Sequence, residues 1–166
     1  MGIFTAAIAL FGNGGPGQLE KKPRGARSDD EPQTRGTVLV IDDDPTFLEA
    51  IRLMLCEAGY NVLASSTGPK GLDMVRYAPK DIRLVLLDYN MPRFNGAETL
   101  EFLRKLNPAL KVVAVSGFRV NDLPESFHRG VQKLLSKPFS NDQLLKTVEE
   151  VLDDNSTSEA AVAGAN

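Results

Sequence analysis

Short apolar runs alternate with segments of helical periodicity between residues 37 and about 152. The runs are TVLVI at 37–41, NVLA at 61–64, LVLL at 84–87, KVVAV at 111–115 and a shorter run at 132–135. Most of them are continuously apolar, which is typical of strands that are buried on both faces of a parallel sheet. The pattern therefore predicts five strands, each followed by a helix.

The helical segments carry apolar residues at spacings of three and four. Asp44 and Pro45 predict the cap and first residue of one helix, and Gly59 predicts its end. The other predicted helices run from about Gly68 to Tyr77, from Asn95–Gly96 to Asn107, from about 121 to 129, and from the capping box of Ser140 and Gln143 to about 152. The helix at 121–129 is the weakest of these, because Pro124 and Gly130 crowd it.

Regular alternation of strands and helices predicts an α/β fold with one doubly wound, five-stranded parallel sheet, (βα)5. Right-handed crossovers place the helices on both faces of such a sheet. The predicted domain covers residues 37–152. Residues 1–36 and 153–166 lack this periodicity, and they are predicted to be a disordered leader or linker and a disordered tail.

Composition and charge limit the classes of partner that the chain is expected to bind. The chain has 166 residues, 42% of them hydrophobic and 25% charged, which suits one globular domain. A net charge of -3 and a pI near 5.2 give no reason to expect direct binding to nucleic acid or to a membrane surface, and the apolar run at 3–11 is too short to span a bilayer. Cys56 is the single cysteine and is predicted to lie on the buried side of its helix, so we expect a reduced, cytoplasmic protein.

Polar residues follow four of the predicted strands at their carboxyl ends, where ligands bind in open parallel sheets. They are Asp42 and Asp43, Asp88 and Asn90, Ser116, and the pair Lys137–Pro138. Three carboxylates in one pocket repel one another, and a hard cation with oxygen ligands is the usual compensation. Mg²⁺ is the expected ion, because it needs few protein ligands and commonly bridges carboxylates to a phosphoryl group.

The lysine and serine extend this chemistry to phosphate. Lys137 supplies a positive charge for a phosphate oxygen, and Ser116 supplies a hydroxyl donor. A carboxylate can act as a nucleophile toward phosphorus when neighbouring positive charge neutralises the phosphoryl oxygens. The polar residues at these strand ends therefore predict a site that holds a phosphoryl group on an aspartate.

Four segments, IDDDP, LLDYNMPRFNG, AVSG and SKPF, resemble the signature segments of the response-regulator receiver domain, the CheY-like family. The resemblance covers residues 37 to about 152. It implies the flavodoxin/CheY-like strand order 2-1-3-4-5. It also implies that the protein is not an enzyme acting on other molecules and that it catalyses only its own phosphorylation and dephosphorylation.

The resemblance assigns a role to each site residue. Asp88 matches the phosphoacceptor, Asp43 the direct metal ligand, and Asp42 the carboxylate that holds metal-bound water. Asn90 matches the position whose main-chain carbonyl completes the metal shell, so the expected metal set is Asp42, Asp43, Asp88 and Asn90. Ser116 and Lys137 match the catalytic hydroxyl and lysine, and Pro138 is expected to follow a cis peptide bond.

The implied partners are a sensor histidine kinase or a histidine phosphotransferase, and a downstream protein. Phosphorylation of Asp88 is expected to draw the Ser116 loop inward and to reshape the face made by the fourth helix, fifth strand and fifth helix.

The sequence departs from the family pattern at three positions. Asn95 replaces a frequent aspartate, which affects only local capping. Leu134 stands where the fifth strand usually has an aromatic residue, so switching is expected to pass through the Ser116 loop and the fourth helix. Phe118 is apolar where a polar side chain can position hydrolytic water, which predicts a long-lived phosphorylated state.

Three alternatives stay open beside a free-standing phosphoacceptor module. The chain can be the receiver part of a larger hybrid kinase, or a receiver-shaped docking module that no longer accepts phosphate. A phosphatase of the haloacid-dehalogenase type also uses an aspartyl phosphate, but that class requires a second carboxylate two residues after the nucleophile, and this chain has Asn90 there.

Overall fold

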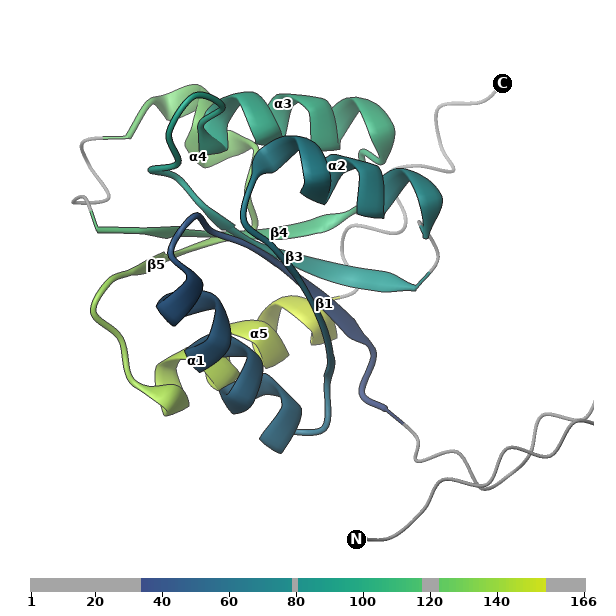
Figure 1. Cartoon of the computed structure of the whole chain (residues 1–166), viewed down its shortest axis with the longest axis vertical. Helices are drawn as coiled ribbons and strands as arrows, with labels where there is room; N and C mark the ends of the chain where they lie inside the picture. Colours follow the sequence, from purple (N-terminus) through teal and green to yellow (C-terminus); the bar gives the residue numbers. More distant parts are fainter. Residues whose placement is uncertain (1–33, 79–80, 118–122, 155–166) are drawn as a thin grey trace, which may run out of the picture. The chain divides into compact units, whose positions relative to one another are not determined.

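A computed structural model of the chain describes residues 34–78, 81–117 and 123–154. Strands and helices alternate along this part of the chain (Figure 1). The strands are β1 (Thr37–Ile41), β2 (Asn61–Ser65), β3 (Ile82–Asp88), β4 (Lys111–Ser116) and β5 (Lys133–Ser136). The helices are α1 (Pro45–Glu57), α2 (Gly68–Tyr77), α3 (Gly96–Leu106), α4 (Glu125–Arg129) and α5 (Asn141–Asp153).

The five strands form one parallel sheet in the order β2-β1-β3-β4-β5. The predicted (βα)5 fold with order 2-1-3-4-5 is therefore confirmed. Strand order reverses between β1 and β3, because the chain moves outward from β1 to β2 and then returns to β3 on the other side. The carboxyl ends of these two central strands form the crevice where open α/β sheets bind ligands.

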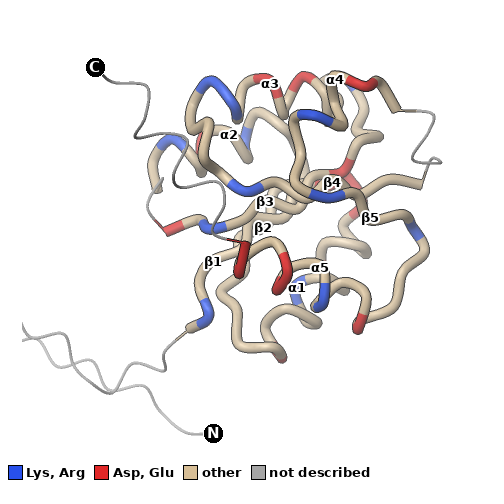
Figure 2. Tube along the Cα trace, turned by 180° about the vertical axis from the view of Figure 1, so that it is seen from behind, with Lys and Arg blue, Asp and Glu red and all other residues tan. Residues whose placement is uncertain are grey.

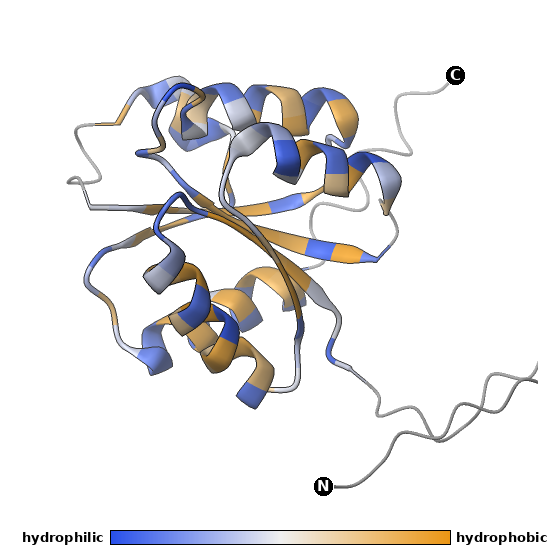
Figure 3. Cartoon of the chain, viewed as in Figure 1, coloured by the Kyte–Doolittle hydropathy of each residue, from blue (hydrophilic) through white to orange (hydrophobic). Residues whose placement is uncertain are grey.

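Two apolar layers enclose the sheet. Helices α1 and α5 cover one face, and α2, α3 and α4 cover the other (Figure 1). The strands are apolar along most of their length, and the helices turn their apolar sides toward the sheet (Figure 3). Leu39 and Leu87 face one layer and Val40 and Leu86 the other, all of them at most 1% exposed. Burial on both faces explains why the strands read as continuous apolar runs.

Local sequence sets the helix ends. Asp44 caps α1 by accepting hydrogen bonds from the Thr46 and Phe47 amides, and Pro45 takes the first helical position. Gly59 adopts a positive φ of 87° just after α1, a conformation that favours glycine at a helix end. Capping boxes begin α3 at Asn95 and α5 at Ser140.

The predicted burial of Cys56 is wrong, because this side chain is exposed. Successive helical residues are separated by about 100°, and the buried face of α1 is defined by Ile51 and Leu55. The residue after Leu55 therefore turns toward solvent.

Charged residues belong mostly to helices, loops and strand ends, and most of the sheet is uncharged (Figure 2). The predicted leader and tail lie mostly outside the described residues, as do Phe118 and the predicted start of the fourth helix at 121. No helix within the described ranges is long and apolar enough to cross a membrane.

Candidate functional site

Two acidic residues meet at the carboxyl edge of the central strands. Ile41 pairs with Leu87 in the register between β1 and β3, so the next residues along the two strands, Asp42 and Asp88, lie side by side. On the other side of β3, Ser116 ends β4 and pairs with Ser136 of β5, which directly precedes Lys137. The parallel register thus brings together residues separated by up to 95 positions in the chain.

Asp42, Asp43 and Asp88 form a carboxylate cluster. Each offers one oxygen atom, and these oxygens all lie within 4.8 Å of one another. Asp42 and Asp88 are only 2% and 4% exposed, whereas Asp43 is exposed. Three anionic oxygens from side chains, with one ligand facing solvent, fit a hard divalent cation that keeps part of its water shell, as Mg²⁺ does. The donor set has no sulfur or imidazole ligand that would favour a softer metal.

Lys137 bridges the two buried carboxylates. Its Nζ donates to Oδ2 of Asp42 at 2.7 Å and to Oδ1 of Asp88 at 2.9 Å. The same ammonium group lies 3.8 Å from the centre of the Phe47 ring, a distance at which a cation and an aromatic face attract each other. The peptide bond between Lys137 and Pro138 is cis, as the family resemblance implied.

Backbone amides orient the remaining oxygens of the buried carboxylates. The amide of Asp44 donates to Oδ1 of Asp42 at 2.9 Å, and the amide of Asn90 donates to Oδ2 of Asp88 at 2.7 Å. A carboxylate oxygen has two lone pairs, so each of these atoms can still contact a cation. Both side chains are therefore held in place before any ligand arrives.

Burial and hydrogen bonding have opposite effects on the pKa values of Asp42 and Lys137. Burial raises the pKa of Asp42, although the hydrogen bonds from Lys137 and the Asp44 amide lower it in part. Burial alone lowers the pKa of Lys137, but its hydrogen bonds to Asp42 and Asp88 outweigh burial and raise the pKa overall. Lys137 is therefore firmly cationic beside the carboxylates.

Ser116 is buried beside this cluster, with 3% of its surface exposed. Its carbonyl accepts a hydrogen bond of 2.8 Å from the Lys137 amide, which ties the end of β4 to the segment that carries the lysine. An open hollow of about 520 Å³ reaches the cluster from solvent. It is lined by Asp43, Tyr89, Asn90, Met91, Pro92 and Asn95.

The structure brings Asp42, Asp43, Asp88 and Lys137 into one cluster and places Ser116 and Asn90 on adjoining strand ends. The roles assigned to these residues stay predictions. The contact between Phe47 and Lys137 was not predicted from the sequence, because the spacing of Phe47 indicated only that it belongs to the apolar face of α1. The contact of Tyr89 with α4 was not predicted either, because no local pattern indicates it.

The family described as the response regulator receiver domain matches residues 38–149. The cell cycle transcriptional regulator CtrA of Caulobacter vibrioides is 31% identical over 117 residues, which are 69% of this chain and 49% of that protein. The cell cycle response regulator CtrA of Brucella ovis is 30% identical over 116 residues, with the same shares. The chain thus spans about half the length of the curated relatives that it matches.

Solved structures agree with this match. A CheY-like response regulator receiver domain protein from Methanospirillum hungatei has 29% identity and a TM-score of 0.65, covering 71% of this chain and 94% of that one. A response regulator receiver domain protein from Clostridium thermocellum has 25% identity and a TM-score of 0.66, covering 70% and 94% of the two chains.

Proposed function

The chain belongs to the response regulator receiver domain family of two-component signalling, and from this premise we propose that it accepts a phosphoryl group on Asp88. The observation that carries the proposal is the position of Lys137, which contacts both Asp88 and Asp42 within a cluster of three carboxylates. This arrangement gathers a nucleophile, a set of cation ligands and a positively charged side chain at one sheet edge.

In the proposed step, an oxygen of Asp88 attacks phosphorus while the bond from phosphorus to the donor nitrogen of a phosphohistidine breaks. The imidazole leaves with the electron pair of that bond and takes up a proton, and an acyl phosphate remains on Asp88. Asp42, Asp43 and Asp88, with the carbonyl of Asn90, would hold Mg²⁺, which supplies positive charge to the phosphoryl oxygens.

The other residues position the reacting groups. The amide of Asn90 holds Oδ2 of Asp88, which orients the carboxylate. Lys137 moves from carboxylate oxygens to a phosphoryl oxygen as negative charge grows there. Ser116 donates its hydroxyl to another phosphoryl oxygen and draws its loop inward. The module performs this chemistry on itself and is not an enzyme toward other substrates.

A sensor histidine kinase or histidine phosphotransferase is the proposed donor, and the face of α4, β5 and α5 is the proposed surface for a downstream protein. The relatives include a protein described as a transcriptional regulator, of which this chain matches about half.

A receiver-shaped docking module is the second candidate, and the complete carboxylate cluster with its lysine favours the phosphoacceptor over it. The test is incubation with Mg²⁺ and acetyl phosphate followed by mass spectrometry of the intact chain. We expect the parent to gain one phosphoryl group and Asp88→Ala to gain none.

Asp73→Ala is the matched control, since Asp73 is an exposed aspartate of α2. It should gain the phosphoryl group as the parent does. Absence of the mass gain in the parent would support the docking module instead.

A further inference from the structure

The side chain next to the acceptor contacts helix α4. Tyr89 directly follows Asp88, and its ring lies against the ring of Phe127 in α4, with centroids 4.9 Å apart and planes at 73°. This edge-to-face geometry is one that aromatic pairs prefer. Tyr89 is half-buried, whereas Phe127 is only 3% exposed and belongs to the apolar layer beneath α3 and α4.

The backbone of Tyr89 is fixed to the sheet and to α3. Its amide donates to the Val115 carbonyl at 3.0 Å, and its carbonyl accepts from the Gly96 amide at 3.0 Å. Asn90, on its other side, donates its amide to Oδ2 of Asp88. A phosphoryl group on Asp88 would change the partners of that carboxylate, so we expect it to act on the turn from Asp88 to Asn90, of which Tyr89 is the middle residue.

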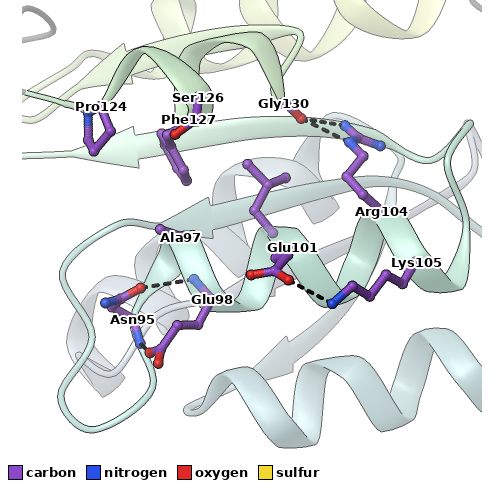
Figure 4. Close-up of a pocket in the computed structure, with 11 residues that line it drawn as sticks. Asn95, Ala97, Glu98, Glu101, Arg104, Lys105, Pro124, Ser126, Phe127 and Gly130 are labelled. Carbon is purple, nitrogen blue, oxygen red and sulfur yellow. Dashed lines mark hydrogen bonds and ion pairs between the residues drawn. The ribbon is translucent and has the colours of Figure 1, made fainter.

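The C-terminal end of helix α4 is tied to α3. At its C-terminal end, the Gly130 carbonyl accepts two hydrogen bonds from Arg104 of α3, from Nε at 2.9 Å and from Nη2 at 2.8 Å (Figure 4). At its N-terminal end, Pro124 provides no side-chain cap. The helix has five residues, and Phe127 is the middle one. Phe127 is therefore the residue of α4 through which a displacement of Tyr89 would act on the helix.

The same ring lines a groove between α3 and α4 of about 630 Å³ (Figure 4). Ala97, Leu100 and Pro124 supply further apolar lining. A tilt of α4 would change the width of this groove. Tyr89 lines the hollow that reaches the carboxylate cluster, so the ring pair joins that hollow to the groove.

On β5, Leu134 pairs with Ala114 of β4 and packs against the same apolar layer. Its aliphatic side chain cannot form a ring contact with α4. Among the aromatic pairs of the described residues, the one between Tyr89 and Phe127 is the one that joins the neighbour of Asp88 to α4.

We propose that the contact between the Tyr89 and Phe127 rings transmits the phosphorylation state of Asp88 to α4 and to the groove between α3 and α4. This inference rests on the proposed phosphorylation of Asp88. Tyr89 and Phe127 act here as positioning residues, and neither touches the reacting atoms.

The test compares the parent with Tyr89→Leu, Phe127→Leu and the double variant. Leucine keeps an apolar side chain at both positions while removing the ring. Mass spectrometry measures phosphoryl gain from acetyl phosphate and Mg²⁺. Amide chemical shifts of residues 125–130 measure the response of α4 to the same treatment.

We expect each single variant to gain phosphate and to lose at least about half of the α4 response. The double variant should lose little more than either single one, because residues acting through one contact are not additive. Tyr89→Phe keeps the ring and should keep the response. Tyr77→Leu, at an exposed tyrosine of α2, is the matched control and should respond as the parent does.

Equilibrium binding of Mg²⁺ with beryllofluoride, a phosphoryl analogue, gives a second measurement. Coupling between two sites is reciprocal, so a ring contact that links α4 to Asp88 must also influence affinity at Asp88. Aromatic pairs contribute on a scale that corresponds to about a two- to tenfold change in affinity, and we expect a shift in that range for Phe127→Leu.

An unchanged α4 response in both single variants, with normal phosphate gain, would overturn this inference and leave the proposed function intact. Absence of phosphate gain in the parent would instead overturn the proposed function.

Discussion

The ammonium nitrogen of Lys137 lies 2.9 Å from Oδ1 of Asp88, although the two residues belong to strand ends that β4 separates. A second hydrogen bond of 2.7 Å joins the same nitrogen to Asp42. One ammonium group therefore offsets part of the charge of two buried carboxylates. Stability and the proposed phosphoryl chemistry thus depend on the same atom.

Lys137→Met should destabilise the protein, because it leaves Asp42 and Asp88 close together without their counter-charge. Breaking a fully buried pair costs about 3–5 kcal/mol, and Lys137 is 27% exposed, so we expect the free energy of unfolding to fall by about 1–3 kcal/mol. Urea denaturation at pH 7 without divalent cations measures this change.

Lys133→Met is the matched control, since Lys133 pairs with Glu150 on the surface. Exposed pairs contribute about 0–1 kcal/mol. Equal losses of unfolding free energy in Lys137→Met and Lys133→Met would contradict a stabilising role of Lys137 between the buried carboxylates.

Asp43→Asn should weaken cation binding while leaving the stability of the fold almost unchanged. Asp43 is exposed, so its replacement should change the free energy of unfolding by no more than about 0.5 kcal/mol. Loss of one of three anionic ligands should weaken Mg²⁺ binding by at least about tenfold, or ~1.4 kcal/mol. The rise in melting temperature with added Mg²⁺ measures the affinity of each variant.

Asp44→Asn is the control for this experiment. Asparagine caps helices as well as aspartate does, and Asp44 uses its side chain for the cap of α1. Its Mg²⁺ response should match that of the parent, and an equal weakening in both variants would argue against Asp43 as a specific ligand.

Gly96→Ala should destabilise the protein through a clash with backbone atoms. An added Cβ would lie 2.5 Å from the Asp88 carbonyl oxygen and 2.7 Å from the Tyr89 Cα. Overpacking of this kind costs about 1–3 kcal/mol, and thermal unfolding measures it. At Gly117 the added Cβ meets no atom of the described residues within 4 Å, so Gly117→Ala should be nearly neutral. Similar losses of stability at both glycines would contradict a backbone clash at Gly96.

Phe118→Glu should shorten the lifetime of the phosphorylated state. The residue lies two positions beyond Ser116, where a polar group can orient the water that attacks the phosphoryl group. One hydrogen bond to that water is worth about 1 kcal/mol, which corresponds to a several-fold change in the rate of hydrolysis. Loss of the phosphoryl group after removal of acetyl phosphate gives the rate. Phe118→Leu should decay as the parent does, and an unchanged rate for the glutamate variant would contradict the expectation.

The sequence predicted the elements wherever a local rule decides them. Asp44 and Ser140 cap helices, Asn107 ends one, and the apolar runs became the central strands. The order of the strands came from family resemblance, because apolar runs do not specify which neighbours they pair with. The weakest predicted helix is also the shortest, at Glu125–Arg129.

Contacts between elements that are distant in the sequence could not be predicted from the sequence. Arg104 resembles a surface arginine at the end of a helix, yet its guanidinium donates to carbonyls of Pro108, Leu110 and Gly130. Burial of that guanidinium lowers the pKa of Arg104. Periodicity also misplaced Cys56, since a residue beside the apolar stripe can face either way until the neighbouring elements are known.

The position of Tyr89 gives the protein a natural optical reporter. The chain has three tyrosines and no tryptophan. Tyr60 precedes β2 and Tyr77 precedes β3, so both lie at the amino edge of the sheet, and only Tyr89 follows a strand at the acidic edge. A change in ultraviolet emission of the unlabelled chain on cation or phosphoryl binding is therefore expected to come from Tyr89, and Tyr89→Leu should remove it.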